Sequence, residues 1–191
     1  MVSKHIFQGA ASAIITPFNE KGVDYPAFEK LLEWQIQQGI NALVICGTTG
    51  EGSTLTDDEH REVIRFTVEK AKGRVPIIAG TGSNSTEHTV TLSKAAEAAG
   101  ADALLVVSPY YNKATQDGLV THYSTVAASV HIPVIIYNVP SRTGLDIPVS
   151  VYQCLSQIPN IAGVKEASTD ISKIAKIKAA CPKDFSVWSG N

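Results

Sequence analysis

The stretch Pro133-Val134-Ile135-Ile136-Tyr137-Asn138 is apolar almost to its end, and the loop Val139-Pro140-Ser141-Arg142-Thr143-Gly144 follows it at once. Parallel strands that are buried on both faces have this continuous apolar character, whereas strands with one wet face alternate apolar and polar residues. Six more segments share it, at roughly the thirty-residue interval of a β-α-β unit. They are residues 10–16, 42–46, 76–80, 103–108, 161–165 and 185–189. We therefore predict seven buried parallel strands.

The segments between these strands carry the start and stop signals of amphipathic helices. Asp24-Tyr25-Pro26 begins the first helix and Gly39 ends it, because proline suits the first turn and glycine suits the residue after the last. Thr56-Asp57-Asp58-Glu59 has the spacing of a capping box, and Ser85 can cap a third helix. Three further helices are expected at residues 116–130, 148–157 and 170–180.

Repeated β-α units build either an open doubly wound sheet or a closed (β/α)8 barrel. A dinucleotide-binding sheet should carry GxGxxG after its first strand, and this chain has only Gly9-Ala10 before it. Polar residues follow each predicted strand, which fits an α/β fold of the TIM-barrel type better than a doubly wound sheet. Such a barrel has eight strands and about 250 residues. We therefore expect a single domain over residues 1–191 that forms an incomplete TIM barrel, without an eighth strand.

Composition argues against several kinds of partner and site. A formal net charge of −2 gives no electrostatic reason to expect nucleic acid or an anionic membrane as a partner. Cys46, Cys154 and Cys181 include no CxxC pair, which argues against a disulfide framework and a zinc site. Residues 1–8 lack the apolar stretch of a secretion signal, and no window resembles a membrane span, so a cytoplasmic location is expected.

The predicted strand ends form a hydroxyl-rich ring with one lysine. Active sites of (β/α)8 barrels lie at these ends. The ring consists of Gly47-Thr48-Thr49-Gly50-Glu51, Gly80-Thr81-Gly82, Pro109-Tyr110-Tyr111, Tyr137-Asn138, Lys165-Glu166 and Ser189-Gly190. It holds no His, Asp and Glu at metal-ligand spacing, so no catalytic metal is expected.

Lys165 ends a buried strand, where desolvation favours a neutral amine that can attack a carbonyl and form an imine. The alternative is a strand-end lysine paired with a carboxylate. Tyr137 ends the preceding strand and can move a proton beside that lysine, or it can simply bond a backbone carbonyl. Thr48 and Thr49 suit a carboxylate, or a tight turn alone. Arg142 offers a planar fork for a second carboxylate, or is a solvated loop arginine.

Three ordered motifs resemble the signature stretches of the dihydrodipicolinate synthase family. They are Gly47-Thr48-Thr49-Gly50-Glu51, the run from Tyr137 to Gly144, and Val164-Lys165-Glu166-Ala167. The likeness extends over essentially the whole chain. It implies a Schiff-base lyase that condenses pyruvate with L-aspartate 4-semialdehyde in lysine biosynthesis, without a cofactor beyond the covalent imine. Members of the family continue through an eighth strand and a C-terminal helical region that helps to build a tetramer.

The resemblance also assigns roles by position. Lys165 would form the imine, and Tyr137, Thr49 and Tyr111 would relay protons, with Tyr111 reaching the neighbouring subunit's site across a homodimer. Thr48 and Thr49 would bind the carboxylate of pyruvate. Arg142 would bind that of the semialdehyde, and Gly190 would offer a backbone carbonyl.

Arg142 favours a substrate with a second carboxylate over the sugar acid of the similar N-acetylneuraminate lyases, which lack an arginine in this loop. Two alternatives stay open. One is a related pyruvate aldolase with a different aldehyde. The other is a truncated, non-catalytic chain that acts as an assembly or binding module.

The family's lysine feedback site is only partly matched. Asn84, Tyr110 and His60 agree with lysine-sensitive members. Gly52, Asp57 and His88 stand where serine, histidine and glutamate are usual. We therefore hypothesise weak or absent inhibition by lysine.

Overall fold

The structure is a computed structural model that describes residues 6–190. Residues 1–5 and residue 191 lie outside the described residues. The expectation that residues 1–8 contain no secretion signal therefore falls partly outside them.

Seven strands form one sheet in which every neighbouring pair is parallel, as predicted. In sheet order they are β1 (Ala11–Ala13), β4 (Ala42–Ile45), β5 (Ile77–Gly80), β6 (Ala103–Val107), β7 (Val134–Asn138), β8 (Ile161–Glu166) and β9 (Ser186–Ser189). Sheet order follows chain order, as in a barrel and unlike a doubly wound sheet, whose strand order reverses at a switch point. The expectation of an incomplete TIM barrel is therefore confirmed for the described residues.

The first strand was predicted too long. It ends at Ala13, and a small hairpin of β2 (Phe18–Asn19) and β3 (Gly22–Val23), which the sequence analysis missed, follows it. The Thr16 hydroxyl donates to the Gly50 carbonyl oxygen at 2.7 Å, and Pro17 has no N–H to continue a ladder. Both features direct the chain out of the sheet.

The six predicted helices are present. They are α1 (Tyr25–Gln37), α2 (Asp57–Ala71), α3 (Thr86–Ala98), α4 (Gln116–Ala128), α6 (Val149–Leu155) and α7 (Ile171–Ala180). Asp24 accepts a hydrogen bond from the Ala27 N–H, and Thr56 forms both halves of the capping box with Glu59. A further one-turn helix, α5 (Pro140–Thr143), was not predicted. No helix within residues 6–190 is both long and apolar enough to cross a membrane.

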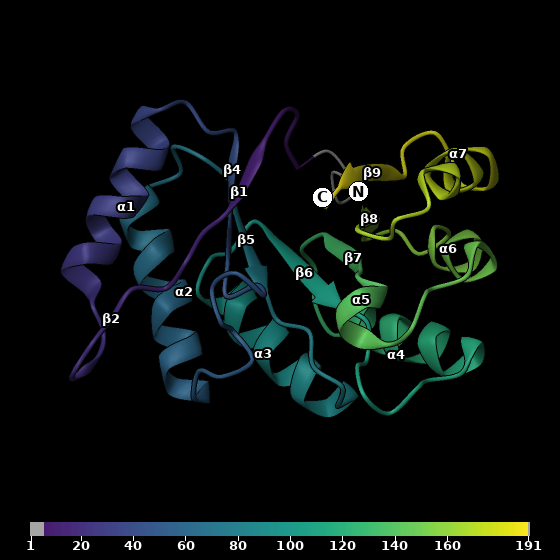
Figure 1. Ribbon diagram of the computed structural model, residues 1–191, viewed down its shortest axis with the longest axis horizontal. Helices are drawn as coiled ribbons and strands as arrows, with labels where there is room; N and C mark the ends of the chain where they lie inside the picture. The colour runs from purple at the N-terminus through teal and green to yellow at the C-terminus, as the bar shows by residue number, and fades with distance from the viewer. Residues whose placement is uncertain (1–5, 191) are drawn as a thin grey trace.

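Successive residues of each strand face opposite sides of the sheet, so the core has two layers. The outer layer packs strand residues such as Leu43, Leu104 and Val134 against the helices. The inner layer contains strand residues of the other phase, such as Val44 and Leu105, and no residue of a long helix. Figure 1 shows the corresponding arrangement, in which the sheet curves and the helices lie around its outside. The inner layer is therefore the interior of an open barrel.

β1 and β9 end the sheet, and each pairs on one side only among the described residues. The two edges are not wholly separate. The ring of Phe7, just before β1, stacks on the Trp188 ring of β9 with 5.3 Å between ring centroids and 15° between planes. This aromatic contact connects the two ends of the open barrel.

His122 is a buried titratable group between α3 and α4. Its Nδ1 lies 2.9 Å from the Thr86 hydroxyl, and burial lowers the pKa of His122 to about 4. In the unfolded chain the His122 imidazole therefore takes up a proton near pH 6.5, whereas in the folded chain it does so only near pH 4. Stability should be full above pH 6.5 and should fall as the pH drops toward 4, by up to about 3 kcal/mol.

We expect His122→Phe to remove most of this contribution from the pH dependence, measured by urea unfolding in steps from about pH 7 to about pH 4. His131→Gln is the matched control, because the His131 side chain is 96% exposed. An unchanged slope in His122→Phe would contradict the prediction.

Candidate active site

Lys165 and Tyr137 lie side by side on the inner face of the sheet. They are register partners on β8 and β7, and the Lys165 Nζ lies 4.6 Å from the centroid of the Tyr137 ring. That both side chains point to the inner face depends on a shift in register at the start of the β7–β8 pairing. Val134 faces Ile161, but the next residue, Ile135, faces Gly163. Because side chains alternate with a period of two, one extra residue on β8 moves Lys165 from the helix side to the interior.

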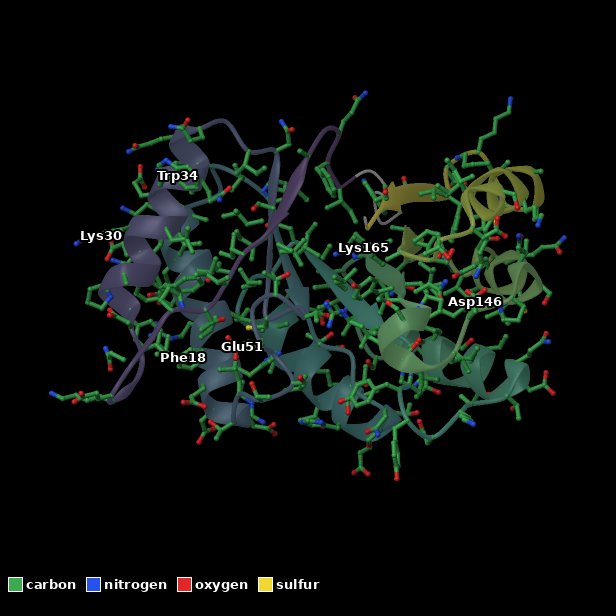
Figure 2. The ribbon with its side chains drawn as sticks, viewed as in Figure 1. Phe18, Lys30, Trp34, Glu51, Asp146 and Lys165 are labelled. Carbon is green, nitrogen blue, oxygen red and sulfur yellow. The ribbon has the colours of Figure 1, made fainter. Side chains whose placement is uncertain are left out.

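The Lys165 side chain has the surroundings of an activated amine. Desolvation lowers the pKa of Lys165, and no carboxylate among the described residues forms an ion pair with it. Gly190 lies against it: a Cβ at Gly190 would stand 3.0 Å from the Lys165 Cε and 2.8 Å from the Ala167 Cβ. Residues 6–190 therefore offer no carboxylate partner that would support the alternative of a paired lysine. Figure 2 shows Lys165 within the curve of the sheet, whereas Lys30 and Trp34 lie on the outer helix α1.

Two cavities of about 310 and 320 Å³ share the barrel interior, with Leu105 in the wall of both. Lys165, Trp188 and Ser189 line the first. The second is lined by three of the predicted site residues, Thr48, Tyr137 and Arg142. The phenol and two candidate carboxylate-binding groups thus share one cavity, and the amine lines the neighbouring one.

Thr49 and Tyr111 are not among the residues that line either cavity. Thr49 is exposed beside Thr48, and Tyr111 is 89% exposed with a φ of 74°. Such a φ is rare outside glycine, so the backbone holds this ring outward at a conformational cost. Within a single chain neither residue shares a cavity wall with Lys165.

Arg142 lies in α5, directly after β7. The Thr143 hydroxyl donates to the Leu145 carbonyl oxygen at 2.9 Å, and Gly144 takes the left-handed conformation that ends this turn. The guanidinium is exposed and forms no ion pair with a described carboxylate. Arg142 is therefore held at the cavity wall with its fork available to an anion.

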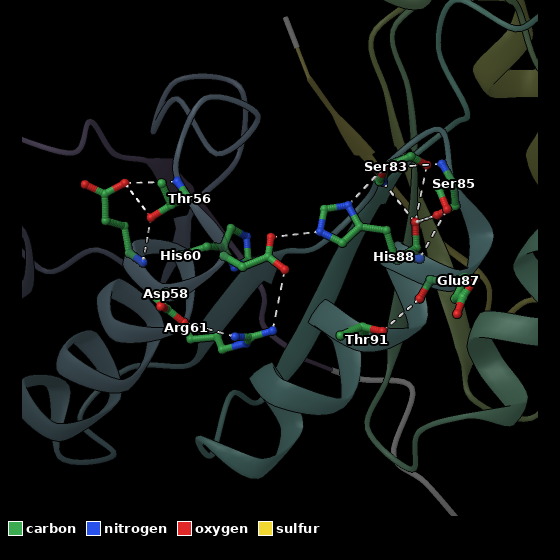
Figure 3. A network of polar contacts seen from close by, with 12 residues as sticks. Thr56, Asp58, His60, Arg61, Ser83, Ser85, Glu87, His88 and Thr91 are labelled. Carbon is green, nitrogen blue, oxygen red and sulfur yellow. Dashed lines mark hydrogen bonds and ion pairs between the residues drawn. The ribbon is translucent and has the colours of Figure 1, made fainter.

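Asp57, His60 and His88, which also line the second cavity, belong to a polar network between α2 and α3 that is drawn in Figure 3. The His88 Nε2 lies 2.9 Å from the Asp57 carboxylate, which also pairs with Arg61 at 3.5 Å. The hydrogen bond from His88 holds the pKa of Asp57 below its usual value. The His60 Nε2 lies 2.8 Å from the Gly80 carbonyl oxygen, and burial lowers the pKa of His60.

Five of the six residues compared with the family's lysine site line this second cavity: Gly52, Asp57, His60, His88 and Tyr110. Asn84 does not line it. Asp57 and His88, which depart from the usual residues, bond to each other.

A polar cluster that the sequence did not predict lies behind β7 and β8, and it is buried except for Asp146. Its members are Asn138, Asp146, Tyr152, Glu166 and Lys173. The one available signal was that Asn138 and Glu166 each follow a predicted inner residue, so alternation turns both toward the helices. Their partners on α6 and α7 were not evident from spacing. Among residues 6–190 no group of three His, Cys, Asp or Glu side chains could hold a metal ion.

The sequence model of the Dihydrodipicolinate synthetase family matches residues 6–191. The chain belongs to this family. The family resemblance predicted from the three motifs is therefore confirmed.

Among curated members of the dihydrodipicolinate synthetase family, the 4-hydroxy-tetrahydrodipicolinate synthase of Acetivibrio thermocellus is 55% identical over 188 residues, 98% of this chain and 64% of the relative. The crystal structure of dihydrodipicolinate synthase from Aquifex aeolicus superposes with a TM-score of 0.95 at 48% identity, covering 97% of this chain and 64% of that one. The enzyme from Acinetobacter baumannii, solved complexed with pyruvate, gives 0.93 at 48% identity, covering 96% and 63%. The chain thus spans about two thirds, at most 64%, of each of these relatives.

We expect the Lys165 amine to react at lower pH than an exposed lysine. Trace labelling with acetic anhydride across a pH series, followed by peptide mapping, measures this residue by residue. Lys176, whose side chain is 63% exposed on α7, is the reference within the same chain. Labelling of Lys165 should approach its plateau below pH 10.5, because desolvation disfavours the ammonium. A Lys165 curve that coincides with that of Lys176 would contradict the prediction.

Proposed function

We propose that the protein condenses pyruvate with L-aspartate 4-semialdehyde to 4-hydroxy-tetrahydrodipicolinate, through an imine on Lys165. The observation that carries the proposal is the desolvated Lys165 amine, which pairs with no carboxylate of the described residues and lies 4.6 Å from the centroid of the Tyr137 ring. Family membership supports it, as do relatives named 4-hydroxy-tetrahydrodipicolinate synthase and a pyruvate complex of a similar enzyme.

In the first step the neutral Lys165 amine attacks the C2 carbonyl of pyruvate. The carbinolamine then loses water, which leaves the imine. We assign the substrate carboxylate to the Thr48 hydroxyl and the proton for the departing hydroxyl to the Tyr137 phenol. This assignment is supported by the cavity that Thr48 and Tyr137 both line and by the position of the Tyr137 ring beside the Lys165 amine. The apolar interior favours this step because desolvation lowers the pKa of Lys165 and so favours the uncharged amine.

In the second step the imine loses a proton from C3 and becomes an enamine, which attacks the aldehyde carbon of the semialdehyde. The amino group of that substrate then adds to the imine carbon and expels Lys165, which closes the ring. Arg142 suits the semialdehyde carboxylate, since no carboxylate of the described residues pairs with its fork and the residue lines the same cavity as Tyr137.

Thr49 and Tyr111 complete the proposed proton relay. Because the Tyr111 ring is 89% exposed, it suits a role in the site of a second copy, across a homodimer formed around Tyr110 and Tyr111. The proposal includes no metal and no dissociable cofactor, and it places the enzyme in cytoplasmic lysine biosynthesis.

Borohydride trapping tests the proposal directly. Incubation with pyruvate and sodium borohydride should add one pyruvate-sized mass, and peptide mapping should place it on Lys165. Lys165→Met should abolish the adduct, and Tyr137→Phe should slow its formation by about 100-fold because the phenol no longer moves the proton. Lys176→Met is the control and should trap like the wild type.

The outcomes separate the three functions. An adduct together with turnover of aspartate semialdehyde supports the proposal, and an adduct with turnover of another aldehyde alone favours the related aldolase. A folded protein without an adduct would point to the non-catalytic module.

We also expect free lysine to inhibit the protein weakly or not at all. Asp57 and His88 bond to each other in the cavity wall, so neither is free for the ligand's ammonium or carboxylate without breaking that pair. Inhibition can be measured as the rate at increasing lysine, with saturating pyruvate. Strong inhibition at micromolar lysine would refute the expectation. Arg61→Met, at the exposed side of the same network, is a control for general loosening of α2.

A further inference from the structure

A polar cluster, buried except for Asp146, lies directly behind the Lys165–Tyr137 pair. Register joins Tyr137 to Lys165 on the inner face and Asn138 to Glu166 on the outer face. The Asn138 side-chain amide donates to the Glu166 carboxylate at 2.7 Å, so the two strands are joined by a side-chain bond one residue from the candidate reacting amine. The Glu166 side chain is only 1% exposed.

Each oxygen of Glu166 is bound by groups from different elements. One oxygen accepts from Asn138 and from the Ser168 N–H at 2.9 Å. The other accepts from the Tyr152 hydroxyl of α6 at 3.2 Å and lies 3.9 Å from the Lys173 ammonium of α7. Burial and the Glu166 carboxylate raise the pKa of Tyr152, so its phenol remains a donor. A carboxylate held on both oxygens has little freedom to rotate.

Asp146 extends the cluster to the loop that contains Arg142. Its carboxylate accepts from Asn138 at 2.8 Å and forms an ion pair with Lys173. The next residue, Ile147, donates its N–H to the Asn138 side-chain oxygen at 3.1 Å. Asn138 and Lys173 therefore hold the segment at Asp146 and Ile147, directly after the loop that contains Arg142. Figure 2 shows Asp146 on the helix side of the sheet, away from the barrel interior.

The two lysines of this region have opposite surroundings. The Lys173 side chain is 6% exposed and paired with both carboxylates, whereas no carboxylate within residues 6–190 pairs with Lys165 on the other face of the sheet. Burying an ion pair is often no more stabilising than burying an apolar pair, so the cluster is weakly explained by stability alone. It does keep the Glu166 charge on the outer face and away from the Lys165 amine.

We propose that Asn138, Asp146, Tyr152, Glu166 and Lys173 form a positioning cluster that holds the Lys165 strand, the Tyr137 strand and the Arg142 loop in one fixed arrangement. None of the five faces the reacting atoms, so they act through the residues that do. The cluster has two separable arms. Glu166 fixes the amine and the phenol, and Asp146 fixes the subsite of the second carboxylate. The inference rests on the proposed function for the roles of Lys165 and Arg142.

The Asp146 arm is tested with Asp146→Asn, which removes the charge from a side chain that is 55% exposed. We expect the KM for aspartate semialdehyde to rise about tenfold, since the Arg142 loop is less well fixed. The rate of pyruvate trapping and the thermal midpoint should change little. Asp146→Glu keeps the carboxylate and should recover most of the lost affinity.

The Glu166 arm is tested with Glu166→Gln, which keeps the shape and the Asn138 bond but removes the charge. We expect the rate of borohydride trapping with pyruvate to fall about tenfold, as the amine and phenol lose their alignment. The acetic anhydride curve of Lys165 should shift in pH as well, and this readout needs no substrate. Lys176→Met, which removes an exposed ion pair on the same helix as Lys173, is the control and should leave every measurement unchanged.

A merely structural role would lower the thermal midpoint of both variants without changing KM, trapping rate or the Lys165 labelling curve below that midpoint. That result would overturn the inference. If the wild type itself gives no adduct, the proposed function fails, while the labelling curves of wild type and Glu166→Gln still test the cluster. Identical curves would then refute it.

Discussion

The register between β7 and β8 is the constraint on which the candidate site depends. A shift of one residue after Val134 places an extra residue on β8, and the strand's alternation is inverted from Gly163 onward. Lys165 then shares the inner face with Tyr137, and Glu166 shares the outer face with Asn138. Without that shift Val164 would occupy the interior, and the lysine would lie beneath the helices.

Close packing fixes this register. Gly163 lies so near β9 that a Cβ would stand 2.2 Å from the Ser186 carbonyl oxygen, and Gly190 lies against the Lys165 stem in the same way. Backbone approach at these two glycines lets β9 and its following residue form one wall around the amine. The other wall is apolar, with Leu105 and Ile135 in the inner layer. The same packing that completes the core therefore also removes water from Lys165 and favours its neutral form.

Charge is distributed across the sheet in a consistent way. The described carboxylates near β8 lie on the helix side, where Glu166 and Asp146 hold Lys173, and the interior near Lys165 is left to hydroxyl and apolar groups. In the second cavity the carboxylate of Asp57 is likewise paired, with His88 and Arg61. An anionic substrate entering the interior would thus meet Thr48 and Arg142 rather than a free carboxylate.

Much of the fold was predictable from local signals. Continuous apolar runs located seven strands, with six of them placed to within one residue of the observed bounds at either end, and caps such as Asp24 and Thr56 located the helix starts. Apolar runs and helix caps depend on residues that are close together in the chain, so the sequence alone predicts them. The hairpin after β1 and the turn α5 were missed because each consists of only a few residues with weak patterns.

The sequence by itself also determined the family and the candidate residues, since its three motifs are contiguous. Only the tertiary structure decided which face of β8 bears Lys165, that Lys173 and not Lys165 pairs with Glu166, and that Asp57 bonds to His88. The physical reason is range. These relations join residues that are distant in the chain, or depend on a one-residue register shift. They are set by packing between strands and helices, which no local pattern records.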